Sequence, residues 1–149
     1  MNNSYANTAL IVIRYILGIL FLISGIGKLI SASEARYLVE LLATEFYWLI
    51  EYADFIVTAT SIFELILAGL LIGNKLLRWA LTGTFALLAI FSSVLGYFYL
   101  QGMTIENCGC FGAFGFASGL EFTLIRNVIL ILLTITAFVL TFRQEPSSD

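Results

Sequence analysis

The sequence predicts an all-α integral membrane protein, a four-helix transmembrane bundle with a short amphipathic helix at the membrane interface. Hydrophobic residues make up 60% of the 149 residues and charged residues only 11%, so the chain is far more apolar than a soluble domain. Its apolar residues gather into four long runs, each close to the ~20 residues that a helix needs to cross a bilayer. We therefore expect a single transmembrane domain over residues 1–149, in contact with the lipid bilayer.

The first predicted span covers residues 8–30. It is apolar except for Arg14 near its start and Lys28 near its end. A cleaved signal peptide is the alternative, because residues 15–27 have the length of a signal core and residues 31–33 are small. Three further spans would need no such leader, so we expect the first span to be retained.

Residues 31–45 mix charged and apolar side chains at helical spacing, which gives a helix one charged and one apolar face. Such a helix is expected to lie along the membrane interface. Ser31, followed three residues later by Glu34, has the pattern of a capping box at its start. The apolar face could equally cover a neighbouring subunit, which leaves a homo-oligomer open.

The remaining spans are predicted at residues 55–72, 79–100 and 120–142. The loop at residues 101–119 joins the last two. Glycines within the spans are expected to mark places where helices approach closely. These glycines are Gly18, Gly25, Gly69, Gly83 and Gly96.

The basic residues predict the orientation. Four fall on one side of the membrane and three on the other: Arg14, Lys75, Arg78 and Arg143 against Lys28, Arg36 and Arg126. By the positive-inside rule, both termini are expected in the cytoplasm of a bacterium and the loop at residues 101–119 on the periplasmic side of its inner membrane. A net charge of −3, scattered along the chain, gives no reason to expect nucleic acid as a partner.

The sequence contains no histidine, which excludes imidazole bases, Ser-His-Asp triads and the usual zinc sites. Both cysteines of the chain, Cys108 and Cys110, stand in the loop on either side of Gly109. Cysteines two positions apart close a disulfide only if the backbone bends, and glycine makes that bend accessible. The small ring would be strained and easily reduced, so it favours thiol exchange over stapling.

Cys108 and Cys110 are thus the candidate catalytic residues on the oxidising side of the membrane. Three other interpretations stay open: a static disulfide, two reduced thiols, and capture of Cu(I) by the thiolates. Phe111 opens a stretch rich in phenylalanine and glycine. That stretch either anchors the loop at the interface or lets a partner's backbone approach the sulfur atoms.

Glu64 stands near the middle of the second predicted span, where an ionisable group costs at least ~2.5 kcal/mol unless it has a partner. Counted at ~1.5 Å per residue from the cytoplasmic ends, Arg14 lies about 9 Å deep and Glu64 about 12 Å deep, so we expect them to meet. The pair would either join two helices or line a path for a quinone or protons.

Arg126 is predicted two turns inside the last span, near the depth of the cysteines. A cation there would stabilise a thiolate, and Lys28 could do the same from the first span. The alternatives for Arg126 are a salt bridge to a nearby carboxylate or a reach to the lipid headgroups. The carboxylates considered are Glu51, Asp54 and Glu121.

Taken together, these motifs resemble the MauE branch of the DoxX-like membrane proteins. The matching residues are Arg14, Gly18 and Phe21, the run Gly25 to Lys28, Glu64, Leu65 and Gly69, the loop Cys108 to Gly112, and the pair Arg126 and Asn127. The family usually has a proline shortly before the second-span glutamate, and residues 59–63 lack it. The resemblance implies a four-helix bacterial inner-membrane protein associated with redox maturation of periplasmic proteins; the name-giving member is linked to a disulfide-rich subunit of methylamine dehydrogenase.

The function predicted from these residues is that of a thiol-disulfide oxidoreductase. Cys108 and Cys110 would exchange disulfides with a periplasmic thioredoxin-like or disulfide-containing protein, and a quinone is the candidate cofactor. Arg126 and Lys28 would tune the thiols. One cysteine pair alone cannot relay electrons across the membrane, so a second dithiol would come from a partner. The alternatives are a non-enzymatic assembly factor, a Cu(I)-handling protein and a helical scaffold for another membrane protein.

Overall fold

The computed structural model describes residues 3–102 and 120–144, and within them the regular elements are helices. They are α1 (Asn3–Ile30), α2 (Ser33–Leu42), the short 3-10 helix η1 (Tyr47–Leu49), α3 (Ala53–Gly73), α4 (Leu77–Leu100) and α5 (Leu120–Gln144). Four of these, α1, α3, α4 and α5, are long and apolar enough to cross a membrane. The predicted all-α membrane bundle with a short amphipathic helix is therefore confirmed.

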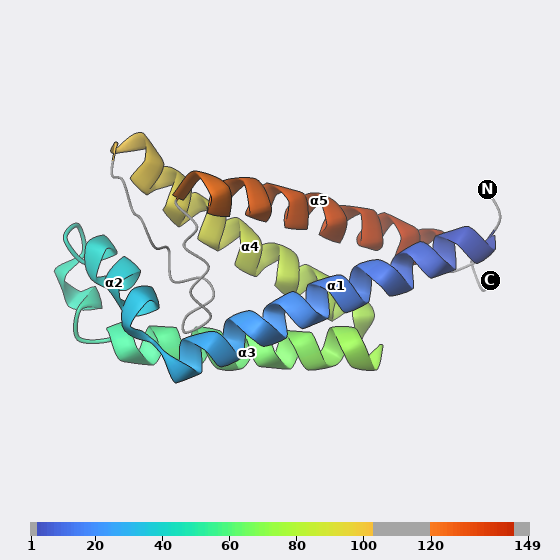
Figure 1. Ribbon diagram of the computed structural model, residues 1–149, viewed down its shortest axis with the longest axis horizontal. Coiled ribbons are helices and arrows are strands. Elements are labelled where there is room, and N and C mark those ends of the chain that lie inside the picture. The colour runs from blue at the N-terminus through green and yellow to red at the C-terminus, as the bar shows by residue number, and fades with distance from the viewer. Residues whose placement is uncertain (1–2, 103–119, 145–149) are drawn as a thin grey trace.

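The four long helices form two closely packed pairs, α1 with α3 and α4 with α5 (Figure 1). Contacts of α1 with α5 and of α3 with α4 close the bundle. Helix α2 lies at the end of the bundle away from the start of α1 and the end of α5. The N-terminal part of α1 projects beyond the end of α3, which later decides the partner of Arg14 (Figure 1).

The bundle buries a narrow seam of apolar side chains and leaves many large ones on its outside. Leu17, Leu71 and Leu81 are fully buried, whereas Phe55 and Ile90 are mostly exposed. In a bilayer the exposed apolar side chains contact lipid, so burying them against another helix gains little free energy. Close packing and polar contacts must therefore hold the helices together.

Helices α1 and α3 approach each other closely at two glycines of α1. A Cβ atom added at Gly18 would lie 2.7 Å from Ile72 Cγ1, and one added at Gly25 would lie 3.1 Å from the backbone oxygen of Ser61. These distances are too short for a relaxed contact, so the close approach depends on glycine. The prediction that Gly18 and Gly25 are close-packing positions is confirmed.

The other three glycines differ in how closely a neighbouring helix packs against them. Gly83 of α4 packs closely, since an added Cβ atom would lie 2.9 Å from Leu67 Cδ2. At Gly69 and Gly96 an added Cβ atom would meet nothing within 4 Å in the described part of the chain, apart from its own helix backbone. The prediction of close packing is wrong for Gly69 and Gly96, because these glycines lie on helix faces that no neighbouring helix approaches.

Helix α2 begins at Ser33, with Ala32 before it in an αR conformation and no side-chain capping hydrogen bond. The prediction that Ser31 is the N-cap residue of a capping box is therefore wrong. A capping side chain needs an extended residue at the helix start, and Ala32 already has helical dihedrals because α1 ends only two residues earlier. Ser31 instead has its hydroxyl 3.3 Å from that of Ser33.

Helix α2 is held against the bundle by an apolar cluster and an ion pair. Its Leu38 packs with Leu95 and Phe98 of α4 and with Leu120 of α5. Arg36 donates hydrogen bonds to both carboxylate oxygens of Asp54 at the start of α3, each 3.0 Å long, and to Glu40 Oε1 at 2.7 Å. Helix α2 therefore covers the end of the bundle where α4 ends and α5 begins.

Candidate functional site

An ion pair is buried between α1 and α3. Lys28 Nζ lies 2.5 Å from Glu64 Oε1, and both side chains are 3% exposed. Gly25 stands nearly one turn before Lys28 on α1, and it packs against Ser61, nearly one turn before Glu64 on α3. The close approach of the two backbones thus brings the ammonium to the carboxylate. Each charge offsets the desolvation cost of the other.

The predicted meeting of Arg14 with Glu64 is wrong. Arg14 Nε donates a hydrogen bond to the backbone oxygen of Leu71 at 3.0 Å, and Nη2 donates to that of Ile72 at 3.3 Å. Backbone oxygens in the last turn of a helix lack partners within the helix and carry partial negative charge, so a buried guanidinium is well placed there. Arg14 therefore binds the C-terminal end of α3.

The prediction was wrong because it counted the depth of each residue from the end of its own predicted span, and these two ends are not level with each other. Helix α1 begins at Asn3 rather than at residue 8, and its N-terminal part projects past the end of α3 (Figure 1). Arg14 is consequently level with the last turn of α3, and Glu64 lies two turns deeper. Lys28, near the opposite end of α1, is the residue level with Glu64.

An aromatic ring from a third helix covers the ion pair. Lys28 Nζ lies 4.5 Å from the centroid of the Phe91 ring on α4. A cation at this distance from a ring face is attracted by the ring quadrupole, by ~2 kcal/mol when desolvated. Lys28 therefore contacts α3 through its charge and α4 through this ring.

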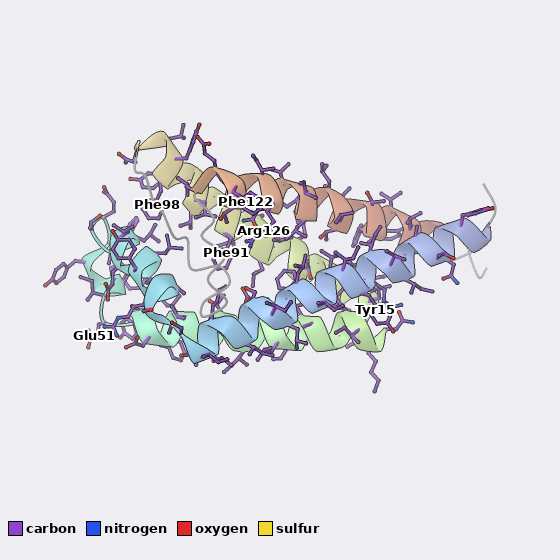
Figure 2. The ribbon with its side chains drawn as sticks, viewed as in Figure 1. Tyr15, Glu51, Phe91, Phe98, Phe122 and Arg126 are labelled. Atoms are coloured by element: carbon purple, nitrogen blue, oxygen red, sulfur yellow. The ribbon has the colours of Figure 1, made fainter. Side chains whose placement is uncertain are left out.

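Helix α5 adds two polar side chains to the same region. Arg126 Nη2 donates a hydrogen bond of 3.3 Å to Asn127 Oδ1, and Asn127 is 2% exposed. Both residues line a cavity of about 40 Å³ together with Lys28, Glu64 and Phe91. Figure 2 shows Phe91 and Arg126 in the space between α1, α4 and α5. Three predicted site residues, Lys28, Glu64 and Arg126, thus come together.

One of the carboxylates predicted to pair with Arg126 has another partner, since Arg36 binds the Asp54 carboxylate.

The second carboxylate oxygen of Glu64 faces a different environment from the first. Glu64 Oε2 is buried and has no hydrogen-bond partner among the described residues. A cavity of about 40 Å³ admits water, which needs ≳10–15 Å³ and polar groups around it. Glu64 Oε2 can therefore accept a hydrogen bond there.

A larger cavity of about 210 Å³ lies between α2, α3 and α4. Its lining is almost entirely aliphatic, and Lys28 and Phe91 belong to the lining of both cavities. Sequence analysis missed this cavity and the role of Phe91. The chain has 13 phenylalanines, and nothing in the sequence sets one apart from the rest.

The cysteine loop is attached at this end of the bundle. It follows Gly102 after α4 and precedes Leu120, the first residue of α5, which packs against α2. Cys108, Gly109, Cys110 and Phe111 lie outside the described residues. Their roles remain predictions.

The fold and the site define a four-span integral membrane protein whose helices enclose a buried ion pair beside a small cavity that charged side chains help to line. A family model, Methylamine utilisation protein MauE, matches residues 6–141 of the chain. The chain belongs to the MauE family. No curated protein and no solved structure matches it.

Proposed function

We propose that this MauE-family membrane protein exchanges disulfides through Cys108 and Cys110 with a partner on the periplasmic side of a bacterial inner membrane. Family membership supports a membrane accessory role. The observation that carries the finer proposal is the charged cluster of Lys28, Glu64 and Arg126. Lys28 and Glu64 are buried and Arg126 is half-buried, in the half of the bundle to which the cysteine loop is attached.

The exchange conserves atoms and electrons. A thiolate of the partner attacks one sulfur atom of the Cys108–Cys110 disulfide, and a mixed disulfide forms. The other cysteine of the pair leaves as a thiolate. The partner's second thiolate then attacks the mixed disulfide at the partner's own sulfur atom and releases the remaining cysteine, which leaves the partner oxidised and Cys108 and Cys110 reduced. The reverse sequence reduces a partner, and the relative reduction potentials set the direction.

The charged cluster would assist by favouring thiolates over thiols. Lys28 and Arg126 carry two positive charges and Glu64 one negative charge, so the group is cationic. Cations near a cysteine increase the fraction of thiolate, which is both the attacking and the leaving species. This supports Lys28 and Arg126 as tuning residues.

The orientation is part of the proposal. The basic residues favour cytoplasmic termini by four to three, as described above. The start of α1 and the end of α5 lie at the end of the bundle opposite α2 (Figure 1). Cytoplasmic termini would therefore put α2 and the attachment points of the cysteine loop on the periplasmic side, where disulfides persist.

The test is thiol trapping in intact cells with a membrane-impermeant maleimide, with and without prior reduction. We expect Cys108 and Cys110 to be blocked until a reductant is added and to be labelled fully afterwards. Cys108→Ser and Cys110→Ser, made singly, should accumulate a reducible adduct with the partner, whereas the double variant should not. Full labelling without reductant, unchanged by a copper chelator, would leave the scaffold interpretation in place of this one.

A further inference from the structure

We propose that the cavity beneath α2 binds the ring of a neutral quinone, with Lys28 donating a hydrogen bond to a ring carbonyl. This inference rests on the proposed function only where the quinone accepts electrons from Cys108 and Cys110. Binding of the quinone itself does not depend on the cysteines. The cavity measures about 210 Å³. Apolar cavities of roughly 150 Å³ already admit benzene, so a substituted ring fits.

The walls of the cavity suit a ring on most sides. Leu38 and Leu42 of α2, Val57 of α3, and Val94 and Leu95 of α4 belong to its lining. Phe91 adds an aromatic ring of its own. Pockets of this kind, mostly apolar with a few placed polar groups, are typical sites for small molecules.

Among the described residues of this lining, Lys28 is the basic side chain, and it is almost fully buried. An ammonium group has three N–H donors. One serves Glu64 and the group also faces the ring of Phe91. A further N–H is left for an acceptor, and Lys28 stands at the wall of the cavity where such an acceptor would lie.

The charge balance at the larger cavity favours a neutral acceptor over an anionic lipid, because Lys28 lines this cavity whereas Arg126, the second cation of the cluster, lines the smaller one. Glu64 already offsets the charge of Lys28 at 2.5 Å. A fatty-acid carboxylate in the same place would be a second buried anion beside Glu64, and buried like charges repel each other strongly. A quinone carbonyl accepts a hydrogen bond without adding charge.

Thr60 fits the reduced form of the same ligand. It lines the cavity, and its hydroxyl donates a hydrogen bond of 2.7 Å to the backbone oxygen of Ile56. Because its proton is engaged, the hydroxyl oxygen is left as an acceptor. A quinol has O–H donors where the quinone has acceptors, so Lys28 and Thr60 together match both states.

The overall redox step is balanced. The thiols of Cys108 and Cys110 lose two electrons and two protons as their S–S bond forms. The quinone gains both and becomes a quinol, its two carbonyl oxygens becoming hydroxyls.

The test measures binding of 2,3-dimethyl-1,4-naphthoquinone to the full-length protein in detergent by equilibrium dialysis. Methyl groups at both reactive positions of this probe block addition of thiols. The background is Cys108→Ser/Cys110→Ser, so failure of the thiol chemistry leaves the binding result intact. We expect saturable binding in this background and in the wild type.

A matched pair of variants locates the site. Val94→Phe fills the cavity, whereas Val128→Phe adds the same side chain at an exposed position of α5. We expect the first to weaken binding about tenfold or more, equivalent to ~1.4 kcal/mol, and the second to leave it unchanged. Lys28→Met/Glu64→Gln, which removes both charges together, should weaken it to a similar degree.

Three outcomes would overturn the proposal. They are the absence of saturable binding, equal affinities for Val94→Phe and Val128→Phe, and displacement of the probe by oleate at lower concentration than by a second quinone. The last would make the cavity a fatty-acid site. Loss of binding in Lys28→Met/Glu64→Gln is counted only if its thermal unfolding matches that of Val128→Phe, and Val94→Phe tests the site independently.

Discussion

The ammonium of Lys28 lies 2.5 Å from Glu64 Oε1 in the buried contact between α1 and α3. The other carboxylate oxygen, Oε2, is buried without a hydrogen-bond partner among the described residues. The two charges therefore depend on each other, because this ion pair is the salt bridge that the described residues show for each of them. This dependence can be measured.

Lys28→Met should destabilise the protein by about 3–5 kcal/mol, because it leaves the Glu64 carboxylate buried and unpaired. Lys28→Met/Glu64→Gln should be clearly more stable than Lys28→Met alone, since no uncompensated charge remains. The measurement is the free energy of unfolding in mixed micelles for Lys28→Met, for Glu64→Gln and for the double variant. Equal destabilisation by the single and double variants would contradict the pairing.

Arg14 gives a second prediction, which separates its observed partners from Glu64. Arg14→Gln should cost about 1–3 kcal/mol, because the backbone oxygens of Leu71 and Ile72 lose a charged donor. Combined with Glu64→Gln, its effect should add to within about 0.5 kcal/mol, as for residues that share no contact. A larger coupling energy in that cycle would restore the pairing of Arg14 with Glu64.

These residues show how far sequence could predict the site. Glu64 was identified because an ionisable group within an apolar span needs a partner. Its partner was not, because the depth of a residue depends on where its helix begins relative to the neighbouring helix. Lys28 and Arg14 are both cations of the first span, and the overhang of α1 past α3 decides between them.

The bundle itself was predictable, because composition and the lengths of the apolar runs determine how often the chain can cross a bilayer. The packing within the bundle was not. Gly25 and Gly69 look alike in sequence, yet only Gly25 faces another backbone closely. The rotation of each helix about its axis decides such contacts, and it also shapes the cavity that Phe91 and Lys28 share.

The two glycines provide a third prediction. Gly25→Ala places a Cβ atom 2.9 Å from Leu65 Cγ and 3.1 Å from the Ser61 backbone oxygen, so it should destabilise the protein by about 1–3 kcal/mol. Gly69→Ala meets no neighbour and should be neutral or stabilising by up to about 1 kcal/mol. Thermal unfolding of both variants in the same detergent tests this, and an equal loss of stability would contradict the close approach of α1 and α3.

The last prediction concerns the ion pair that holds α2 over the larger cavity. Glu40 and Asp54 raise the pKa of Arg36, chiefly through the hydrogen bond to Glu40, so Arg36 stays charged at every accessible pH. Its stabilising effect therefore comes from its charged hydrogen bonds to the two carboxylates. The contacts are exposed, so Arg36→Gln should change global stability little.

The larger effect of Arg36→Gln should be local. Helix α2 forms one wall of the cavity, so a weaker attachment should speed amide hydrogen exchange in Ser33–Leu42 and leave exchange in α4 unchanged. High salt should have the same effect on the wild type, because it screens exposed charges. Arg78→Gln, at the opposite end of the bundle, is the control. If both variants leave exchange in α2 unchanged, the apolar cluster around Leu38 alone holds this helix in place.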